Sequence, residues 1–125
     1  MGQIIARRLA KQGAKVAIFD VNQQGLEATA AEADNITPFQ CDISNREEVG
    51  ARVAQVANEL GTIELLVHAA ALMPSHLLID HTHEGMEQLF RINYFGTTLF
   101  DGGSHPCWSM GRAECDTRGP RSDHQ

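Results

Sequence analysis

The sequence predicts an α/β fold built on a doubly wound parallel sheet. Three short runs rich in β-branched and aromatic residues are typical of strands, at residues 15–19, 36–41 and 63–69. Segments with helical spacing of apolar residues precede, separate and follow these runs. This alternation favours parallel strands joined by right-handed helical crossovers.

Composition and charge narrow the class of protein. A chain of 125 residues with 42% hydrophobic content fits one soluble domain. Its net charge of -6 argues against nucleic acid or membrane as a partner, because both bind through clustered lysine and arginine. No apolar run is long enough to cross a bilayer, and Arg7 and Arg8 interrupt any signal-peptide core. Three irregularly spaced cysteines form no disulfide framework, so we expect a cytoplasmic protein.

The first helix, expected at residues 3–12, has an apolar stripe and a basic face, and Gly13 suits the left-handed position that ends a helix. The stripe consists of Ile5, Ala6, Leu9 and Ala10. The basic face, expected to meet water, consists of Arg7, Arg8 and Lys11. The strand at 15–19 is predicted to be buried on both faces.

The next helix and strand follow the same plan. Asn22 is a good N-cap for a helix over residues 22–33. Its apolar positions are Leu26, Ala30 and Ala33. The strand at 36–41 contains Pro38, which cannot donate a ladder hydrogen bond, so we expect it near the sheet edge.

Two further helices flank the third strand. Ser44 and Glu47 form a capping box for a helix that Gly61 ends. Its apolar stripe is Val49, Val53, Val56 and Leu60. After the strand at 63–69, a helix is expected to start near Thr82. Its apolar side carries Met86, Leu89, Phe90 and Phe95.

Two carboxylates follow the first two strands, where parallel sheets bind their ligands. Asp20 there could accept both ribose hydroxyls of an adenosine and would repel a 2′-phosphate, which favours NAD over NADP. A helix-capping or solvated Asp20 competes equally. Asp42 could reach the exocyclic amine of an adenine, although Ser44 opens a helix two residues later, which favours a capping role.

The N-terminus of the first helix is a third candidate. Gly2 has no side chain, so a pyrophosphate could approach the free N–H groups and the positive end of the helix dipole. Without context, Gly2 is better interpreted as an ordinary small residue behind Met1.

Four motifs in the same order resemble the first half of the short-chain dehydrogenase/reductase family. They are "GQIIARRLAKQGAKVAIFDVN", "CDIS", "IELLVHAAA" and "RINYFGTTLF", over about residues 1–100. The resemblance implies a Rossmann-like fold, an NAD cofactor and oxidation of a secondary alcohol or reduction of a ketone. Met1 and Gly2 match the end of the family's TGxxxGxG turn, under the pyrophosphate. The resemblance also implies that Asp20 binds the ribose and that Asp42 and Ile43 lie beside the adenine.

Two more segments carry expectations from the resemblance. Residues 68–71, "HAAA", stand where the family has NNAG, so Ala69, Ala70 and Ala71 are expected to pass close to the cofactor. Ala69 replaces an Asn whose amide links strands. Asn93 matches the family's helix Asn, whose backbone carbonyl holds a water of the catalytic proton relay. Without the resemblance, Asn93 would be interpreted as an ordinary polar position on a mostly apolar helix.

The family's catalytic groups are absent from the chain. The family uses a Tyr activated by a Lys four residues on, with a Ser that polarises the substrate oxygen. Here the single tyrosine, Tyr94, is followed four residues later by Thr98, and the only lysines are Lys11 and Lys15. We therefore expect a truncated oxidoreductase without turnover in isolation. The alternative is a non-catalytic remnant that binds nucleotide weakly or associates with full-length subunits, and a receiver or flavodoxin-like domain is less favoured.

The resemblance also implies an incomplete sheet. The family places its first strand between the strand ending at Asp20 and the strand ending at His68, and that strand is missing here. Strands 15–19 and 63–69 would have to pair directly or leave a gap. Each backbone group left unpaired and buried in a gap would cost about 1–3 kcal/mol.

The pattern ends near Phe100, so we expect a partial dinucleotide-binding domain at 1–100 and an unstructured tail at 101–125, as in a frameshift, splice variant or truncated gene. The tail histidines and cysteines lack zinc spacing. They are His105, Cys107, Cys115 and His124. No metal site is expected there, nor at His76, His81 and His83. In the family, helix 83–100 packs on a second subunit, which implies a homo-oligomer.

Overall fold

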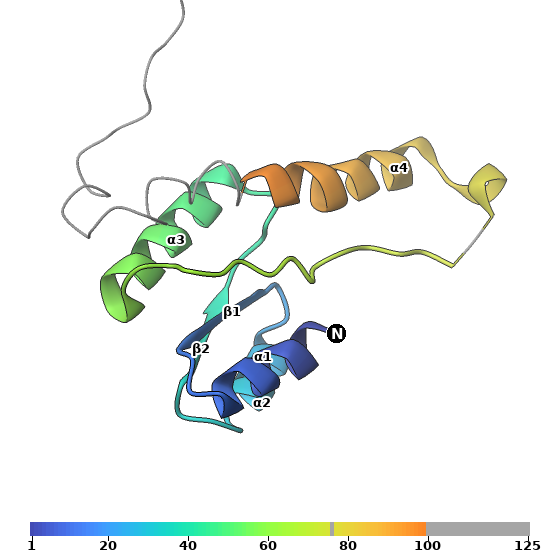
Figure 1. Cartoon of the computed structure of the whole chain (residues 1–125). Coiled ribbons are helices and arrows are strands. Elements are labelled where there is room, and N and C mark those ends of the chain that lie inside the picture. The colour runs from blue at the N-terminus through green and yellow to red at the C-terminus, as the bar shows by residue number, and fades with distance from the viewer. Residues whose placement is uncertain (76, 100–125) are drawn as a thin grey trace, which may run out of the picture.

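The computed structural model describes residues 1–75 and 77–99, in which helices and strands alternate along the chain (Figure 1). The elements are α1 (Gly2–Lys11), β1 (Val16–Asp20), α2 (Gln23–Ala30), β2 (Ile36–Gln40), α3 (Arg46–Leu60), the 3-10 turn η1 (Leu78–Asp80), α4 (His83–Phe90) and the π-helical turn η2 (Arg91–Gly96). The tail at 101–125, expected to be unstructured, lies outside the described residues.

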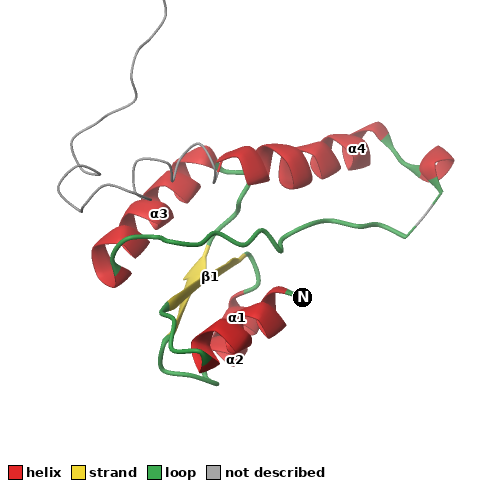
Figure 2. Cartoon of the chain, viewed as in Figure 1, coloured by secondary structure: helices red, strands yellow, loops and turns green. Residues whose placement is uncertain are grey.

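β1 and β2 form a two-stranded parallel sheet. Their register runs from Val16 opposite Ile36 to Asp20 opposite Gln40, and the rings of Phe19 and Phe39 stack with centroids 5.5 Å apart. Helices α1 and α2 lie on one side of the strands and α3 on the other (Figure 2). The α/β class is confirmed. The expectation that β1 is buried on both faces is wrong, because its apolar residues are half-buried and β2 is its only strand neighbour in the described part of the chain.

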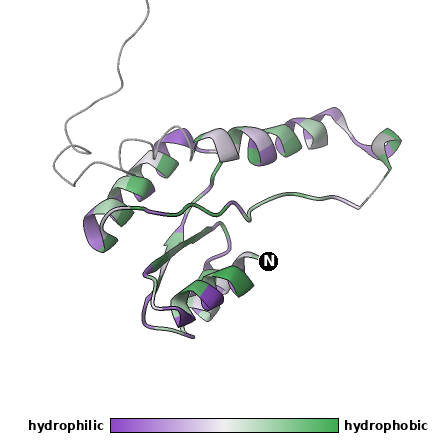
Figure 3. Ribbon diagram, viewed as in Figure 1, coloured by the Kyte–Doolittle hydropathy of each residue, from purple (hydrophilic) through white to green (hydrophobic). Residues whose placement is uncertain are grey.

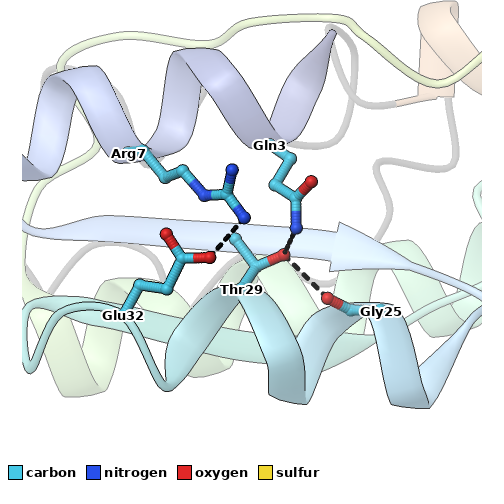
Figure 4. Close-up of polar contacts among 5 residues, drawn as sticks. All are labelled: Gln3, Arg7, Gly25, Thr29 and Glu32. Atoms are coloured by element: carbon cyan, nitrogen blue, oxygen red, sulfur yellow. Dashed lines mark hydrogen bonds and ion pairs between the residues drawn. The ribbon is translucent and has the colours of Figure 1, made fainter.

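Polar contacts attach α1 to α2 (Figure 4). Gln3 Nε2 donates to Thr29 Oγ1 at 3.0 Å, and that hydroxyl donates to the carbonyl of Gly25 at 2.7 Å. Arg7 pairs with Glu32 in the turn that follows α2. Arg7 was expected to face water, but this pairing leaves it half-buried, with its Nε atom buried and without a hydrogen-bond partner.

The helix ends show which capping predictions hold. Asn22 caps α2 as predicted, since its side chain accepts the Gly25 N–H. Gly13 and Gly61 follow α1 and α3 with φ of 89° and 102°, the left-handed region expected of them. The capping box predicted at Ser44 is wrong: Asn45 caps α3, because the Asp42 carboxylate already engages the Ser44 hydroxyl and amide.

The core lies where α3 covers the end of β2. Cys41, Val49, Val53 and Ala57 form a buried cluster, and four half-buried apolar side chains pack against it. These are Phe19, Ile43, Ile63 and Leu66. The apolar stripe predicted for α3 is confirmed at Val49, Val53 and Val56, which are all buried.

The third predicted strand, residues 63–69, is not a strand in the structure. This segment crosses above the sheet without joining a ladder (Figure 1), and Figure 3 shows hydrophobic residues along it. Leu65 and Val67 are 64% and 43% exposed. An apolar run forms a strand only when a neighbour pairs with its backbone, and β1 does not reach this one. The sequence left two arrangements open, direct pairing of residues 15–19 with 63–69 or a gap between them, and the structure has the gap.

α4 begins where the sequence predicts. The Thr82 hydroxyl accepts the Gly85 N–H, which makes Thr82 the N-cap. The predicted apolar side is largely open: Phe90 and Phe95 are 58% and 55% exposed, and no residue of α4 is buried. α4 continues into η2, a π-helical turn that the sequence did not predict.

Candidate functional site

The carboxyl ends of both strands lie at one edge of the sheet. Asp20 is opposite Gln40 in the register, and the Cys41 N–H donates to the Asp20 carbonyl at 3.1 Å. Past the strands, Gln40 Nε2 donates to the carbonyl of Val21 at 3.1 Å. Asp20 and Asp42 therefore follow neighbouring strands at the same edge, as the sequence predicted.

The first turn of α1 reaches the same end of the sheet. α1 connects through residues 12–15 to the start of β1, and its ten residues are about as long as the five-residue strand. Its N-terminus is therefore level with the strand's carboxyl end. The N–H groups of Ile4 and Ile5 donate to the carbonyl of Met1 and are the first backbone donors of the helical hydrogen-bond pattern. The N–H groups of Gly2 and Gln3 come before this pattern begins.

Gly2 also lies against the 68–71 loop. A Cβ atom built on Gly2 would stand 3.2 Å from the Ala69 Cβ. This is tight for a side chain, so glycine lets the helix N-terminus approach the loop closely. Met1, in contrast, is 97% exposed and contributes only its carbonyl to the first turn. Ala70 and Ala71 are exposed.

Asp20 is exposed at the carboxyl end of β1, and its carboxylate accepts a backbone hydrogen bond. Its Oδ1 accepts the N–H of Asn22 at 2.9 Å, which stabilises the turn into α2. The helix N-cap itself is Asn22. Of the alternatives expected for Asp20, the solvated one is present and the helix-capping one is not, and the hydrogen bond to Asn22 uses one of the two carboxylate oxygens.

The Asp42 carboxylate turns back on its own loop. Its Oδ1 accepts the Ser44 hydroxyl at 2.8 Å and the Ser44 N–H at 2.9 Å. These two bonds hold the pKa of Asp42 below its usual value, and the positive charge of Arg91 acts in the same direction. The carboxylate is exposed and stays ionised near neutral pH.

Asn93 connects η2 to the loop after Ala71. Its Oδ1 accepts the Leu72 N–H at 2.8 Å, and its Nδ2 donates to the Leu72 carbonyl at 2.9 Å. The Asn93 carbonyl accepts the hydroxyl of Thr97 at 3.1 Å. The contacts seen here are those of a side chain that fixes a loop, and the predicted water-holding role of the carbonyl stays a prediction.

Gly96, also on η2, is buried against Ile43. A Cβ atom on Gly96 would lie 2.9 Å from both Cγ1 and Cδ1 of Ile43 and 3.3 Å from its carbonyl oxygen. Gly96 was not among the site residues predicted from the sequence. An isolated glycine inside an apolar helical pattern was the signal that could have indicated a close approach.

Other candidate chemistry is not assembled in the described residues. Within residues 1–75 and 77–99, no three metal-ligating side chains come together. His81 and His83 belong to this range, whereas His76 and the tail residues His105, Cys107, Cys115 and His124 lie outside it. No helix in the described part of the chain is long and apolar enough to cross a membrane.

Comparison with known proteins decides the family. Residues 1–110 match the sequence model of a family described as "Enoyl-(Acyl carrier protein) reductase". The structure superposes with a TM-score of 0.81 on a solved short-chain dehydrogenase/reductase, the glucose/ribitol dehydrogenase of Brucella melitensis, at 23% identity. The chain belongs to the short-chain dehydrogenase/reductase family. The resemblance drawn from the four motifs is confirmed.

Individual relatives differ in the reactions their names describe. The sorbitol dehydrogenase of Cereibacter sphaeroides is 35% identical over an alignment of 101 residues, which covers 78% of this chain and 38% of that protein. Estradiol 17-beta-dehydrogenase 11 of Rattus norvegicus is 31% identical over 105 residues, 78% of this chain and 35% of the relative. The chain thus spans less than two fifths of these short-chain dehydrogenase/reductase relatives.

A second solved member contains a nicotinamide cofactor. The 3-ketoacyl-(acyl-carrier-protein) reductase of Brucella melitensis, complexed with NADH, has a TM-score of 0.79 and 29% identity. The match covers 85% of this chain and 44% of that chain, as the match to the glucose/ribitol dehydrogenase covers 86% and 46%. An incomplete Rossmann fold of the short-chain dehydrogenase/reductase type accounts for both the good superposition and the partial coverage.

Among residues 1–75 and 77–99, the proton-transfer groups used by the short-chain dehydrogenase/reductase family have no counterpart near the edge. Tyr94 is 60% exposed and packs edge-on against Phe95. The hydroxyl of Thr98, four residues after Tyr94, donates to the Phe95 carbonyl at 2.9 Å. The only lysines of the chain, Lys11 and Lys15, stand at the end of α1 and just before β1.

Proposed function

We propose that the chain is the nucleotide-binding part of an NAD-dependent oxidoreductase that acts on a secondary alcohol or ketone, and that it has no turnover alone. The observation that carries the proposal is the meeting of three features at one sheet edge: the open first turn of α1, the Asp20 carboxylate and the Asp42 loop. These are the groups that a pyrophosphate, a ribose and an adenine require.

The chemistry of this edge fits NAD. The amides of Gly2 and Gln3 precede the helical ladder, and we propose that phosphate oxygens approach them past the bare Cα of Gly2. One Asp20 oxygen is held by the Asn22 amide, and the exposed carboxyl group has a second oxygen for ribose hydroxyls. Its negative charge would repel a 2′-phosphate, which favours NAD over NADP. Asp42 and Ile43 would border the adenine, and Ala69, Ala70 and Ala71 would line the loop nearest to Gly2.

Absence of turnover follows from the residues that are present. A nicotinamide cofactor would supply or accept the hydride, whereas the protein must move the proton at the carbinol oxygen. The chain has no Tyr-x-x-x-Lys pair to do this. The carbonyl of Asn93 is proposed to hold one water of the relay, a role that needs the missing Lys to be productive.

We expect weak binding because the sheet is incomplete. Residues 63–69 join no ladder with β1, and Leu65 and Val67 expose apolar side chains. The exposed residues 69–71 lie outside any sheet, and ordering this loop on binding costs conformational entropy. The dissociation constant for NADH should lie in the millimolar range or above.

A second role is favoured by α4. The exposed rings of Phe90 and Phe95 lie on the helix that, in the family, packs against another subunit. We propose association through helix 83–100, either with a second copy or with full-length subunits, in the cytoplasm. This remains the non-catalytic alternative.

Titration with NADH, followed by its fluorescence and by NMR, tests the proposal. We expect saturable binding in the millimolar range, weakened by Asp20→Asn. Asp34→Asn is the matched control, because Asp34 is an exposed aspartate just before the opposite end of β2. Binding much tighter than millimolar, an equal effect of both substitutions, or oxidation of any secondary alcohol above background would contradict the proposal.

A further inference from the structure

η2 contacts two loops at the candidate nucleotide edge. On one side, Asn93 makes two hydrogen bonds to the Leu72 backbone, at 2.8 and 2.9 Å. On another, Gly96 lies directly against Ile43, and Arg91 contributes positive charge beside Asp42. A single π-helical turn therefore joins the loop that follows β2 to the loop that follows Ala71. π-Helical turns inside α-helices recur at functional sites.

The contact between Gly96 and Ile43 leaves no room for a methyl group. A Cβ on Gly96 would be 2.9 Å from two side-chain carbons of Ile43 and 3.3 Å from its backbone oxygen. Ile43 cannot simply rotate away, because it packs against the buried cluster that includes Cys41 and Val53. A methyl group would therefore displace the backbone around Ile43 as well as its side chain.

We infer that Gly96 is a positioning residue that acts through Ile43. By allowing η2 to pack against the 42–43 loop, Gly96 fixes the place of Asp42 and Ile43 at the edge of the sheet. The inference rests on the proposed function for its consequence, namely that this loop borders the adenine. Gly96 itself does not contact the nucleotide.

The loop has amides that report its position without any ligand. The Ser44 N–H donates to Asp42 Oδ1 at 2.9 Å, and the Asn45 N–H donates to the Asp42 carbonyl at 2.9 Å. Hydrogen exchange at Ser44 and Asn45 therefore measures whether the loop keeps its geometry. Exchange at Leu26, in the buried face of α2, reports global stability separately.

Gly96→Ala is the test, and Gly50→Ala is its control. Both glycines are helical, but a Cβ on Gly50, in α3, would meet nothing within 4 Å. In Gly96→Ala we expect exchange at Ser44 and Asn45 to accelerate by about tenfold and the NADH dissociation constant to rise by about tenfold, the effect of moderate overpacking. Gly50→Ala should accelerate exchange at neither loop amide and should leave the NADH dissociation constant unchanged. In Gly96→Ala, exchange at Ser44 and Asn45 should accelerate more than exchange at Leu26, which measures the global part of the destabilisation.

A double-substitution cycle shows whether Ile43 transmits the effect. Ile43→Ala removes both carbons that Gly96→Ala would clash with. Adding Gly96→Ala to Ile43→Ala should therefore change exchange and NADH affinity by less than about twofold. The inference would be overturned if Gly96→Ala changed amide exchange and NADH affinity as much in the Ile43→Ala background as in the unsubstituted chain. It would also be overturned if Gly96→Ala accelerated hydrogen exchange at Leu72 while exchange at Ser44 and Asn45 stayed unchanged.

The two proposals fail in different ways. If the unsubstituted chain shows no NADH binding, the proposed function is wrong, while the exchange comparison still decides whether Gly96 positions the loop. If NADH binds but Gly96→Ala alters neither exchange nor affinity, the proposed function stands and the role given to Gly96 is wrong.

Discussion

The side-chain amide of Asn93 and the backbone of Leu72 form a closed pair of hydrogen bonds. Asn93 Oδ1 accepts the Leu72 N–H at 2.8 Å and Nδ2 donates to the Leu72 carbonyl at 2.9 Å. Asparagine is suited to this pairing because its amide has both a donor and an acceptor on one short side chain. Through it, η2 holds a segment that lies outside any sheet.

Asn93→Ala should destabilise the chain by about 1–2 kcal/mol, because a net hydrogen bond contributes about 0.5–1.5 kcal/mol and two are lost. Asn93→Asp should be at least as harmful, since its carboxylate would face the Leu72 carbonyl. Chemical denaturation measures both, with the exposed Gln88→Ala on α4 as the control. An unchanged midpoint in Asn93→Ala would show that the pair contributes nothing to stability.

Thr29→Val tests the contact between α1 and α2. The substitution keeps the shape of a buried side chain but removes the hydroxyl that accepts from Gln3 and donates to Gly25. We expect a loss of about 1–2 kcal/mol in the free energy of unfolding. Glu32→Gln, which only weakens a half-exposed ion pair with Arg7, should cost less than about 1 kcal/mol. The reverse order of the two effects would refute this account of the helix contact.

The Asp42 loop predicts a pH dependence in the acid range. The pKa of Asp42 is lowered in the folded chain, from 3.8, so the bonds to Ser44 contribute stability above pH 3.8 that is lost as the pH falls through the folded value. Ser44→Ala should raise the Asp42 pKa more than Arg91→Gln does, because the Ser44 hydroxyl is the larger cause. Carboxyl NMR titration of Asp42 checks this. An Asp42 pKa indifferent to Ser44→Ala would refute it.

Cys41 should be unreactive in the folded chain. Burial chiefly, with the nearby charge of Glu48, raises the pKa of the thiol from 9.0 to about 11, so little thiolate exists at pH 8. Alkylation followed by peptide mass spectrometry should label Cys41 only at the rate of unfolding. As the pH rises above 9.0, the unfolded state gains thiolate first and stability should fall. Rapid labelling of Cys41 under native conditions would contradict its buried position.

Local sequence patterns predicted helix ends well where the residues at the end themselves determine the hydrogen bonding or the backbone conformation. Asn22, Thr82 and the glycines at 13 and 61 mark helix ends through short-range hydrogen bonding and φ, and these were confirmed. The capping box at Ser44 was wrong for a reason that spacing does not reveal. Two residues upstream, Asp42 competes for the same hydroxyl and amide, and Asn45 takes the capping position.

Features that depend on distant neighbours were less predictable. The run at 63–69 has strand composition, yet pairing is a property of two segments and none in the described chain provides the second. The close approach of Gly96 to Ile43 joins positions 53 residues apart in the sequence and also required tertiary structure. For the site, strand ends predicted Asp20 and Asp42 at one edge, but the Asn93 bonds to Leu72 could not be inferred from residue type.

An amide-resolved NMR titration of the chain with NADH tests the central claim most directly. The account predicts that shift changes gather at the amides of Gly2 and Gln3, after β1 at Val21, and around Ile43, with an affinity in the millimolar range. Changes confined to α4, or no saturable change at any of these amides, would contradict a nucleotide site at this edge of the sheet.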